Sequence, residues 1–389
     1  MKRKISLLLV MILVLSTLMN VVTAESEDAS VENKVLELTI EEAVKIATEN
    51  SREMWKIDDG IKQLQDAKRL GLNAKELYEQ MSNLPMGTMD ISGDQYVSFI
   101  LSKNGYYSKA EELKTKELKK TKESLLIGIK IDITSSYYDV LLKEKAIEIN
   151  QAKLDKANEQ LRVVNLKFNN GSATKAEVLA AEMAIQQAKT DLDSAVDDLN
   201  IAKLDFLNKL ELPFDTEFVL TDTISSYVPT SGINLDEIIE KAKQDRIEIL
   251  TAENDLELQK IETHAITAYY TSNLRQHKAA KEELKDAELK VPQAYKNVEL
   301  DVRKTYLNLI KAERALINLD KTLEIAKESA RINKLLYDNG MATSLEVLDA
   351  NTKLSEAEIG RYQLLAAYNI SKFMFDNSNI FGSTKPAGR

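Results

Sequence analysis

A repeated spacing of apolar residues constrains this chain more than any other feature. Between Val298 and Asp338 the sequence contains neither glycine nor proline, and its apolar side chains recur at intervals of three, four or seven residues. This spacing places one apolar stripe along a helix and is typical of coiled-coil packing. So thin a rod cannot bury its own stripe, so it must pack on other helices and on other subunits. The stripe consists of Val302, Tyr306, Leu309, Leu316, Leu319, Leu323, Ala326, Ala330 and Tyr337.

The same pattern occurs twice in the chain. The residues 169 positions before the stripe are apolar at every place except Asn150. The sequence LTIEEA from Leu38 likewise aligns with INLDEI from Ile233, at an offset of 195. The chain is therefore predicted to be an internal duplication. Because the two offsets differ by 26, the first half should contain 26 extra residues, which we place near Asn83–Gly105.

The few helix breakers define the predicted architecture. The chain has only 12 glycines and five prolines, and Asn170-Gly171 and Asn339-Gly340 stand at equivalent places in the two halves. Glycine tolerates the left-handed conformation that ends a helix. Each half is predicted to contain an ascending helix, an apex, a long descending helix, a tight Asn-Gly turn and a long returning helix. The fold class is all-α, built of long antiparallel coiled-coil hairpins in a tandem repeat, with at most one short strand near Glu217–Leu220.

The N-terminal residues are typical of an export signal. Lys2, Arg3 and Lys4 precede an apolar run, and Val22-Thr23-Ala24 offers small residues before Glu25. The alternative is an uncleaved anchor helix, because the run approaches the ~18 residues that span a bilayer. The predicted segments are a signal peptide (1–24), an acidic leader (25–37), a first repeat (38–211), an inter-repeat connector (212–232), a second repeat (233–376) and a flexible tail (377–389).

Composition argues against several classes of function. The net charge of −10 disfavours nucleic-acid binding, which needs faces rich in Lys and Arg. The chain has no cysteine, which excludes disulfides, thiolate metal sites and a cysteine nucleophile. Its only two histidines, His264 and His277, are expected to be ordinary surface residues. We therefore predict no catalytic site, no metal site and no cofactor, and expect that the protein is not an enzyme.

Two segments carry a resemblance to a known family. KFNNGSATKAEVLAAEMAIQQAKTDLDSA and LYDNGMATSLEVLDANTKLSEAEIG resemble the paired helical-hairpin tips of the TolC-like outer membrane efflux protein family. LTIEEAVKIATEN resembles the opening helix of that family. The resemblance extends from about Leu38 to Phe375, and it implies a homotrimer whose repeats form a long α-barrel through which drugs, toxins or proteins leave the cell.

The resemblance also implies which residues form functional sites. In that family the tips meet a membrane-fusion adaptor, which couples the tube to a pump in the inner membrane. Acidic residues after the second tip form an aperture in that family, and the matching residues here are Glu346 and Asp349. The alternative interpretations are plain helix caps for the glycines, and acids favoured by the macrodipole of a helix N-terminus. The residues that match the docking tips are Asn170, Gly171, Ala173, Thr174, Asn339, Gly340, Ala342 and Thr343.

The chain differs from the family pattern at the apex of each half. Family members insert a pair of membrane strands there, and the second half has only a charged segment, His264–Val291, predicted to be helical on both sides of a turn near Thr271–Leu274. The membrane strands therefore look reduced or missing. In the first half, Val97–Leu101 (VSFIL) is a buried plug, a partner contact or a shallow membrane contact, and we favour burial.

We therefore predict the outer component of a tripartite efflux or type I secretion system, a trimeric passive exit duct docked to an adaptor and a pump. The predicted location is the cell envelope, in the outer membrane if the source cell has one and otherwise extracytoplasmic. No nucleic-acid partner is expected, and a membrane contact is left open. The alternative is an exported coiled-coil structural or interaction protein of the envelope that lacks the membrane strands.

Overall fold

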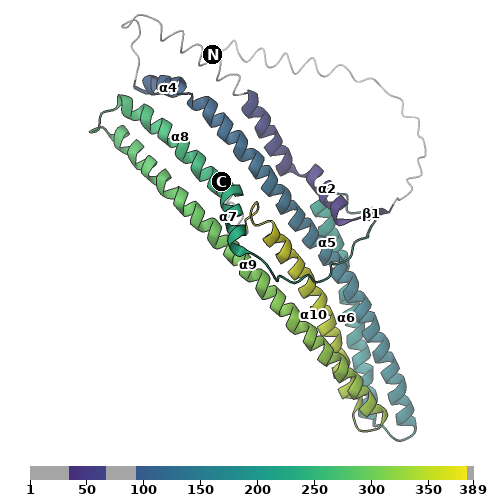
Figure 1. Cartoon of the computed structure of the whole chain (residues 1–389). Helices are drawn as coiled ribbons and strands as arrows, with labels where there is room; N and C mark the ends of the chain where they lie inside the picture. The colour runs from purple at the N-terminus through teal and green to yellow at the C-terminus, as the bar shows by residue number, and fades with distance from the viewer. Residues whose placement is uncertain (1–34, 67–92, 383–389) are drawn as a thin grey trace, which may run out of the picture.

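The computed structural model describes residues 35–66 and 93–382, and it is almost wholly helical. The predicted signal peptide, most of the acidic leader and the end of the tail lie outside these residues. Figure 1 shows long helices running side by side along one rod. Residues 52–66 are also helical. The elements are β1 (Leu36–Leu38), α2 (Ile40–Asn50), α4 (Gly93–Lys103), α5 (Tyr106–Asn169), α6 (Lys175–Leu210), β2 (Phe218–Leu220), α7 (Leu235–Asp245), α8 (Ile247–Tyr269), α9 (Arg275–Asp338) and α10 (Ser344–Asp376).

The all-α fold class and the internal duplication are confirmed. Helices α5 and α9 both have 64 residues and begin 169 residues apart, at Tyr106 and Arg275. Helices α6 and α10 also begin 169 residues apart, and α2 and α7 both have 11 residues and begin 195 apart. Helix α4 has no counterpart in the second half, so it belongs to the predicted insertion, of which residues 83–92 lie outside the described chain.

Three details of the fold concern the strand, the apex turn and a proline. The strand in the connector is confirmed as β2, but it pairs in parallel with a second strand, β1, in the segment predicted as a leader. The turn of the second apex is confirmed between Tyr269 and Arg275. Pro292, one of the five prolines, lies inside α9 and does not break it. An interior proline removes one backbone hydrogen bond from a helix. The packing of α9 along its length on α8 and α10 offsets this loss.

The long helices form a layer with two edges. In its lower part α5 packs between α6 and α10, and α9 packs on the far side of α10. In its upper part α5 packs on α8, and α8 packs on α9. The order across the lower layer is therefore α6, α5, α10, α9. Each helix has a narrow buried stripe rather than a broad core, as the coiled-coil spacing predicts.

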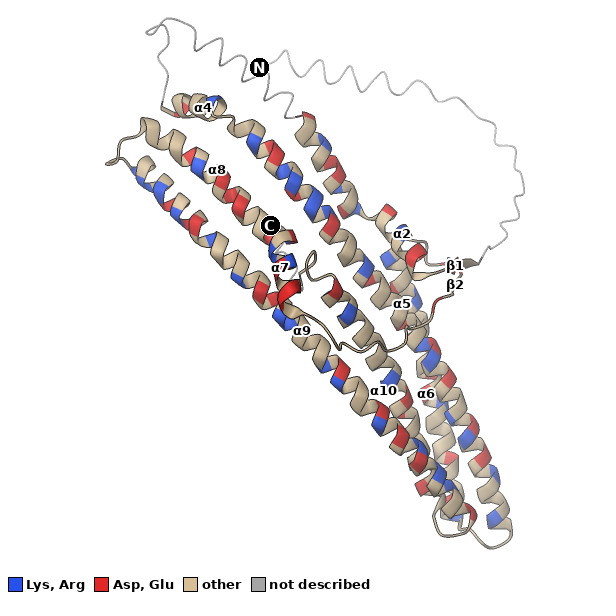
Figure 2. Cartoon of the chain, in the orientation of Figure 1, with Lys and Arg blue, Asp and Glu red and all other residues tan. Residues whose placement is uncertain are grey.

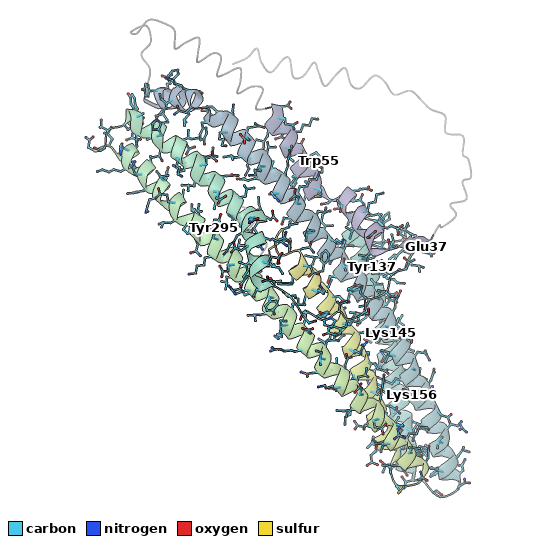
Figure 3. The ribbon with its side chains drawn as sticks, in the orientation of Figure 1. Glu37, Trp55, Tyr137, Lys145, Lys156 and Tyr295 are labelled. Atoms are coloured by element: carbon cyan, nitrogen blue, oxygen red, sulfur yellow. The ribbon has the colours of Figure 1, made fainter. Side chains whose placement is uncertain are left out.

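The connector between the repeats is fixed to the middle of the rod. The Tyr137 hydroxyl donates a 2.8 Å hydrogen bond to the carbonyl of Leu38 and accepts one from the backbone N–H of Asp222. The Asp222 carboxylate accepts a 2.7 Å hydrogen bond from the N–H of Ile40, the first residue of α2. Burial raises the pKa of Tyr137. These bonds explain why the strand pair forms here, where the ring of Tyr137 also packs edge-on against Phe206 (Figure 3).

The C-terminal residues fold back onto the second repeat around one buried arginine. Arg246, which separates α7 from α8, is 2% exposed and pairs with Glu248 at 2.6 Å and with Asp301 of α9 at 3.0 Å. Its guanidinium also donates hydrogen bonds to the carbonyls of Ser378 and Phe381. Burial lowers the pKa of Arg246, but the bonds to Glu248 and Asp301 outweigh it, so the group stays charged.

Candidate docking tips and aperture

The two Asn-Gly turns have the same backbone geometry. Gly171 and Gly340 have φ angles of 73° and 74°, in the left-handed region that favours glycine. In the first turn the N–H of Gly171 bonds to the carbonyl of Phe168, and that of Ser172 bonds to Lys167. The second turn repeats this pair of bonds from Gly340 and Met341. Both turns are therefore Schellman caps, which satisfy the free carbonyls at the end of a long helix.

The helix that leaves each turn begins with a capping box. Thr174 and Thr343 are the N-caps of α6 and α10, and the hydroxyl of each accepts a hydrogen bond from the backbone N–H of the glutamate three residues later. The carboxylates of Glu177 and Glu346 accept bonds from the threonine N–H in return, at 2.7 Å and 2.6 Å. Each tip is thus fixed on both sides of the turn.

The two tips of one chain also pack on each other. Val164, Val178, Tyr337 and Val347 form a buried cluster with Ala181 between the hairpins. The amine of Lys167 lies over the Tyr337 ring, 3.5 Å from its centroid, and donates a 2.9 Å hydrogen bond to the Tyr337 carbonyl. The amide of Gln160 donates a buried 2.8 Å bond to the hydroxyl of Ser344. The tips are therefore one composite surface rather than two separate loops.

The predicted docking residues occupy this surface, and no observation tests that they dock a partner. Ala173 and Ala342 are half-buried and pack against the cluster that joins the tips. The other six are exposed: Asn170, Gly171, Thr174, Asn339, Gly340 and Thr343. Met341 and Leu345, which the sequence analysis did not select, are 70% and 65% exposed. Their position beside the turn was the available signal, because an apolar residue there has no helix of its own to pack against.

The two predicted aperture acids both have partners in the single chain. Hydrogen bonds from the backbone and hydroxyl of Thr343 lower the pKa of Glu346, so it is a structural capping residue. Glu177 occupies the same position in the first tip. Asp349 forms a 2.7 Å ion pair with Lys353, one turn later on the exposed face of α10. Their role in an aperture stays a prediction.

A shallow groove lies beside these acids. It separates α6 from α10 over α5 and has a volume of about 450 Å³. Met183, which is 73% exposed, Leu345 and Leu348 provide apolar lining, and Asp349 and Lys153 lie among them. The groove brings Asp349, but not Glu346, together with exposed apolar side chains.

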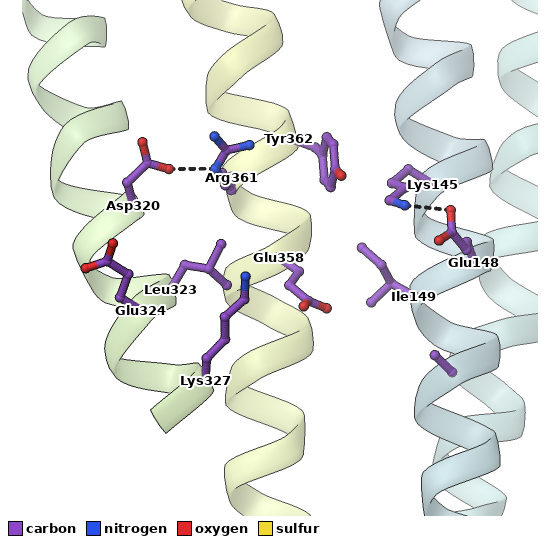
Figure 4. Close-up of a pocket in the computed structure, with 11 residues that line it drawn as sticks. Lys145, Glu148, Ile149, Asp320, Leu323, Glu324, Lys327, Glu358, Arg361 and Tyr362 are labelled. Carbon is purple, nitrogen blue, oxygen red and sulfur yellow. Dashed lines mark hydrogen bonds and ion pairs between the residues drawn. The ribbon is translucent and has the colours of Figure 1, made fainter. Parts of the chain in front are cut away.

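A second pocket lies higher, between α5, α9 and α10, with a volume of about 610 Å³ (Figure 4). Arg361 donates a 2.6 Å hydrogen bond to Asp320, and Lys145 donates one of 2.6 Å to Glu148 (Figure 4). The bond to Glu148 raises the pKa of Lys145. The Arg361–Asp320 pair joins α10 to α9, whereas the Lys145–Glu148 pair lies within α5, and neither pair provides a nucleophile and base in contact.

The charged side chains are spread along the rod. Figure 2 shows acidic and basic residues interleaved on every long helix. Within residues 35–66 and 93–382, no group of three or more His, Asp or Glu side chains is arranged to hold a metal ion. In the same residues, no helix is both long enough and apolar enough to cross a bilayer.

Comparisons with known proteins agree with this geometry. Residues 269–372 match the family described as outer membrane efflux protein. No curated protein sequence matches the chain. A membrane protein from Pseudomonas aeruginosa has a similar structure, with a TM-score of 0.68 and 13% identity over 91% of this chain and 92% of that one. CusC aligns with a TM-score of 0.67 and 14% identity, over 88% of this chain and 92% of its own.

A third solved structure, the outer membrane protein VceC from Vibrio cholerae, aligns with a TM-score of 0.65 and 13% identity, over 87% of this chain and 95% of its own. At these identities the likeness shows the fold alone. The fold and the tips thus define a TolC-like protein of tandem helical hairpins. Residues 269–372 are similar to the outer membrane efflux protein family, which supports a transport component of the cell envelope rather than an enzyme.

Proposed function

We propose that this protein is the outer component of a tripartite efflux or type I secretion system. Three copies would close into a passive exit duct, and the tips would dock a membrane-fusion adaptor coupled to an inner-membrane pump. The observation that carries the proposal is that α6 and α9, the two outer helices of the layer, leave apolar side chains exposed at its two edges.

The two outer helices of the layer carry most of its exposed apolar residues. Helices α6 and α9 together have 12 exposed large apolar side chains, whereas the inner helices α5 and α10 have five. On α9 these residues include Leu289, Leu300, Leu307, Ile325 and Ile332, whose spacings of 11, 7, 18 and 7 are near whole numbers of helical turns. They form one stripe, opposite the stripe that is buried against α10. A helix that is apolar on two opposite sides is expected where neighbours flank it on both sides.

The internal repeat predicts what fills these edges. Within the chain, α5 of the first repeat packs on α10 of the second, where Gln160 meets Ser344. The equivalent contact, shifted by one repeat, joins α9 to α6. No comparable packing joins those two helices within the described chain. The missing contact can form between copies, with Ser329 of one copy at the place of Gln160 and Lys175 of the next copy at the place of Ser344.

A closed ring is the simplest assembly that fills both edges. Because the two edges are different surfaces, the contact is head-to-tail and closes only if the rotation returns to its start. Three copies place six hairpins, and so six tips, around one axis. The exposed backbone of all six turns, together with the Met341 side chain of every second tip, would then form a ring-shaped surface on which an adaptor can dock.

Substitutions on the exposed stripe of α9 test the assembly. Leu307 and Ile325 are 64% and 70% exposed in the single chain, so Leu307→Glu with Ile325→Glu should leave the monomer folded. We expect the unsubstituted chain to have the mass of a trimer by light scattering, and the variant to have that of a monomer with unchanged helical circular dichroism. The matched control is Met341→Glu, which is equally exposed but lies at the tip, and it should stay trimeric. A monomeric unsubstituted chain would contradict the duct.

Two contacts favour the alternative, a structural or interaction protein of the envelope. The Lys167–Tyr337 and Gln160–Ser344 contacts already join the tips in a single chain, so a monomer could present a rigid docking surface. A photo-crosslinking residue in place of Met341 distinguishes the duct from a monomeric docking protein. The duct predicts crosslinks in cells to an adaptor, which are lost when the stripe variant stops assembly, whereas a monomeric docking protein predicts crosslinks that persist.

A further inference from the structure

The end of the rod opposite the tips carries a cluster of aromatic and basic side chains. This end is formed by α4, the start of α5, the end of α8 and the start of α9 (Figure 1). Residues 93–109 and 266–281 contain five of the 14 tyrosines in the chain. We name the cluster the apical patch, and it comprises Tyr96, Lys103, Tyr106, Tyr107, Tyr269, Tyr270, Arg275, Lys278 and Lys281.

The tyrosines of the apical patch hold one another in place. The rings of Tyr96 and Tyr269 lie 5.2 Å apart, and those of Tyr269 and Tyr270 lie 4.9 Å apart. The Tyr270 hydroxyl donates a 3.0 Å hydrogen bond to Asp94, which fixes α4 against α8. Tyr107 and Tyr269 remain 47% and 46% exposed. The result is a fixed aromatic surface of the kind that is enriched at the boundary between a bilayer and water.

The same end is basic, although the chain is acidic. The two segments carry five Lys and Arg residues and one Asp. One of the five, Lys109, pairs with Glu112 and Glu257 just beyond the segments, which leaves four cations at the very end of the rod. Lys103, Arg275, Lys278 and Lys281 are exposed, and none of them is ion-paired with a carboxylate in the parts that the structure describes. Figure 2 shows basic residues at the start of α9 in blue.

Helix stability does not explain the position of two of these cations, although it favours Lys103 in the last turn of α4. Arg275 and Lys278 lie in the first turn of α9, where the helix macrodipole disfavours positive charge. The first turn of α9 has no acidic residue, whereas α6 and α10 begin with Glu177 and Glu346. The cations therefore cost the free monomer some stability, and an anionic partner would reverse that cost.

We propose that the apical patch binds the surface of an anionic lipid bilayer, with its tyrosines among the headgroups and its cations against the lipid phosphates. The basic charge of the patch complements such a surface, and tyrosine side chains suit its interfacial layer. The contact is peripheral and lies at the other end of the rod from the tips. It does not depend on the tips docking an adaptor or on the assembly of the duct.

Vesicle binding tests the charge requirement. The probes are vesicles of phosphatidylcholine with and without phosphatidylglycerol, and the chain starts at Glu25 so that the apolar run of the predicted signal cannot itself insert. We expect cosedimentation only when phosphatidylglycerol is present, weakened by added salt. Lys278→Gln with Lys281→Gln should lower the partition coefficient about tenfold or more, from the loss of two cations near the surface. The matched control, Lys304→Gln with Lys321→Gln, changes two exposed lysines lower on α9 and should leave binding unchanged.

Tryptophan quenching tests which end touches the lipid. The chain has one tryptophan, Trp55, which is 65% exposed and lies well below the apex (Figure 3). Brominated lipids should not quench Trp55 in the bound unsubstituted chain. They should quench the new indole in Trp55→Phe with Tyr107→Trp. Three results would overturn the proposal: no binding to phosphatidylglycerol at low salt, equal losses in the two lysine variants, or quenching of Trp55 without quenching at position 107.

Discussion

The amine of Lys167 lies 3.5 Å from the centroid of the Tyr337 ring and donates a hydrogen bond to the carbonyl of the same residue. The two residues come from equivalent helices of the two repeats but not from equivalent positions. Leu336 stands one repeat after Lys167, and Phe168 stands one repeat before Tyr337. This one contact between the tips inside a chain therefore involves a cation, whereas its repeat-related counterpart between copies, Leu336 with Phe168, would be apolar. Phe168 is 39% exposed in the single chain, as expected of a residue that packs on a neighbouring copy in the assembly.

Removal of the Lys167 charge should loosen the paired tips. Lys167→Met keeps the length of the side chain and removes both the cation–π contact and the hydrogen bond. We expect the free energy of unfolding, from urea denaturation, to fall by about 1–2 kcal/mol. The matched control is Lys189→Met on the exposed face of α6, which should change it little. Equal values for the two variants would show that the Lys167–Tyr337 contact does not stabilise the tips.

The tip glycines should be sensitive to conformation rather than to size. A Cβ atom added at Gly340 would meet nothing within 4 Å, so any cost comes from the left-handed φ angle. We expect Gly340→Ala to lower the free energy of unfolding by about 1–2 kcal/mol, and Gly340→Asn to lower it less, because asparagine tolerates this conformation. Gly360→Ala is the control, since Gly360 lies inside α10 and alanine there should stabilise the helix. A loss from Gly360→Ala as large as that from Gly340→Ala would refute this explanation.

The capping role of Glu346 predicts a pH dependence. Hydrogen bonds from Thr343 lower the pKa of this carboxyl in the folded chain below its ordinary value. A lowered folded pKa adds stability above the unfolded pKa, and that stability is lost as the pH falls through the folded pKa. Glu346→Gln should therefore destabilise the chain at neutral pH, by thermal unfolding, and the difference should vanish at acid pH. A constant difference across the acid range would contradict the capping account.

Arg246 should hold the C-terminal residues on the second repeat. Its guanidinium is buried between Asp301, Glu248 and the carbonyls of Ser378 and Phe381, so Arg246→Met removes the donor that joins these acceptors. We expect a loss of about 3–5 kcal/mol in the free energy of unfolding and faster proteolysis of residues 377–382, measured by mass spectrometry. Arg303→Met, which breaks an exposed pair with Glu299, is the control and should cost less than about 1 kcal/mol. Proteolysis at the same rate in both variants would contradict the clamp.

Local patterns in the sequence were sufficient for the helices and the turns. The spacing of the apolar stripe and the 169-residue offset predict α5 and α9 with the same length. The Asn-Gly dipeptides predict both Schellman turns. These features depend on neighbouring residues, so the sequence shows them. Strand β1 was not predicted, since three residues make no pattern and its partner β2 lies about 180 residues away in the chain. The sequence alone does not show that Pro292 lies inside a helix, because the packing of a long helix on two sides outweighs one missing hydrogen bond.

The candidate site was likewise predictable from the sequence only in part. The tip residues could be located from the turn motif, whereas the contacts of Lys167 with Tyr337 and of Gln160 with Ser344 could not. Those contacts join segments about 170 and 184 residues apart and depend on how the hairpins pack. The family resemblance suggested an aperture for Glu346, which stays a prediction, and the structure shows that the same carboxylate forms a capping box with Thr343.

The most direct test of the duct is a disulfide between copies. The chain has no cysteine, so Lys175→Cys with Ser329→Cys places the only two thiols at the repeat-related counterparts of Ser344 and Gln160. After oxidation, the account predicts a covalent trimer on a denaturing gel that reduction returns to monomer. The control, Gln160→Cys with Ser344→Cys, should form its disulfide within one chain and stay monomeric. Monomers only, or a ladder of ever longer chains, from the Lys175→Cys, Ser329→Cys variant would contradict a closed three-copy ring.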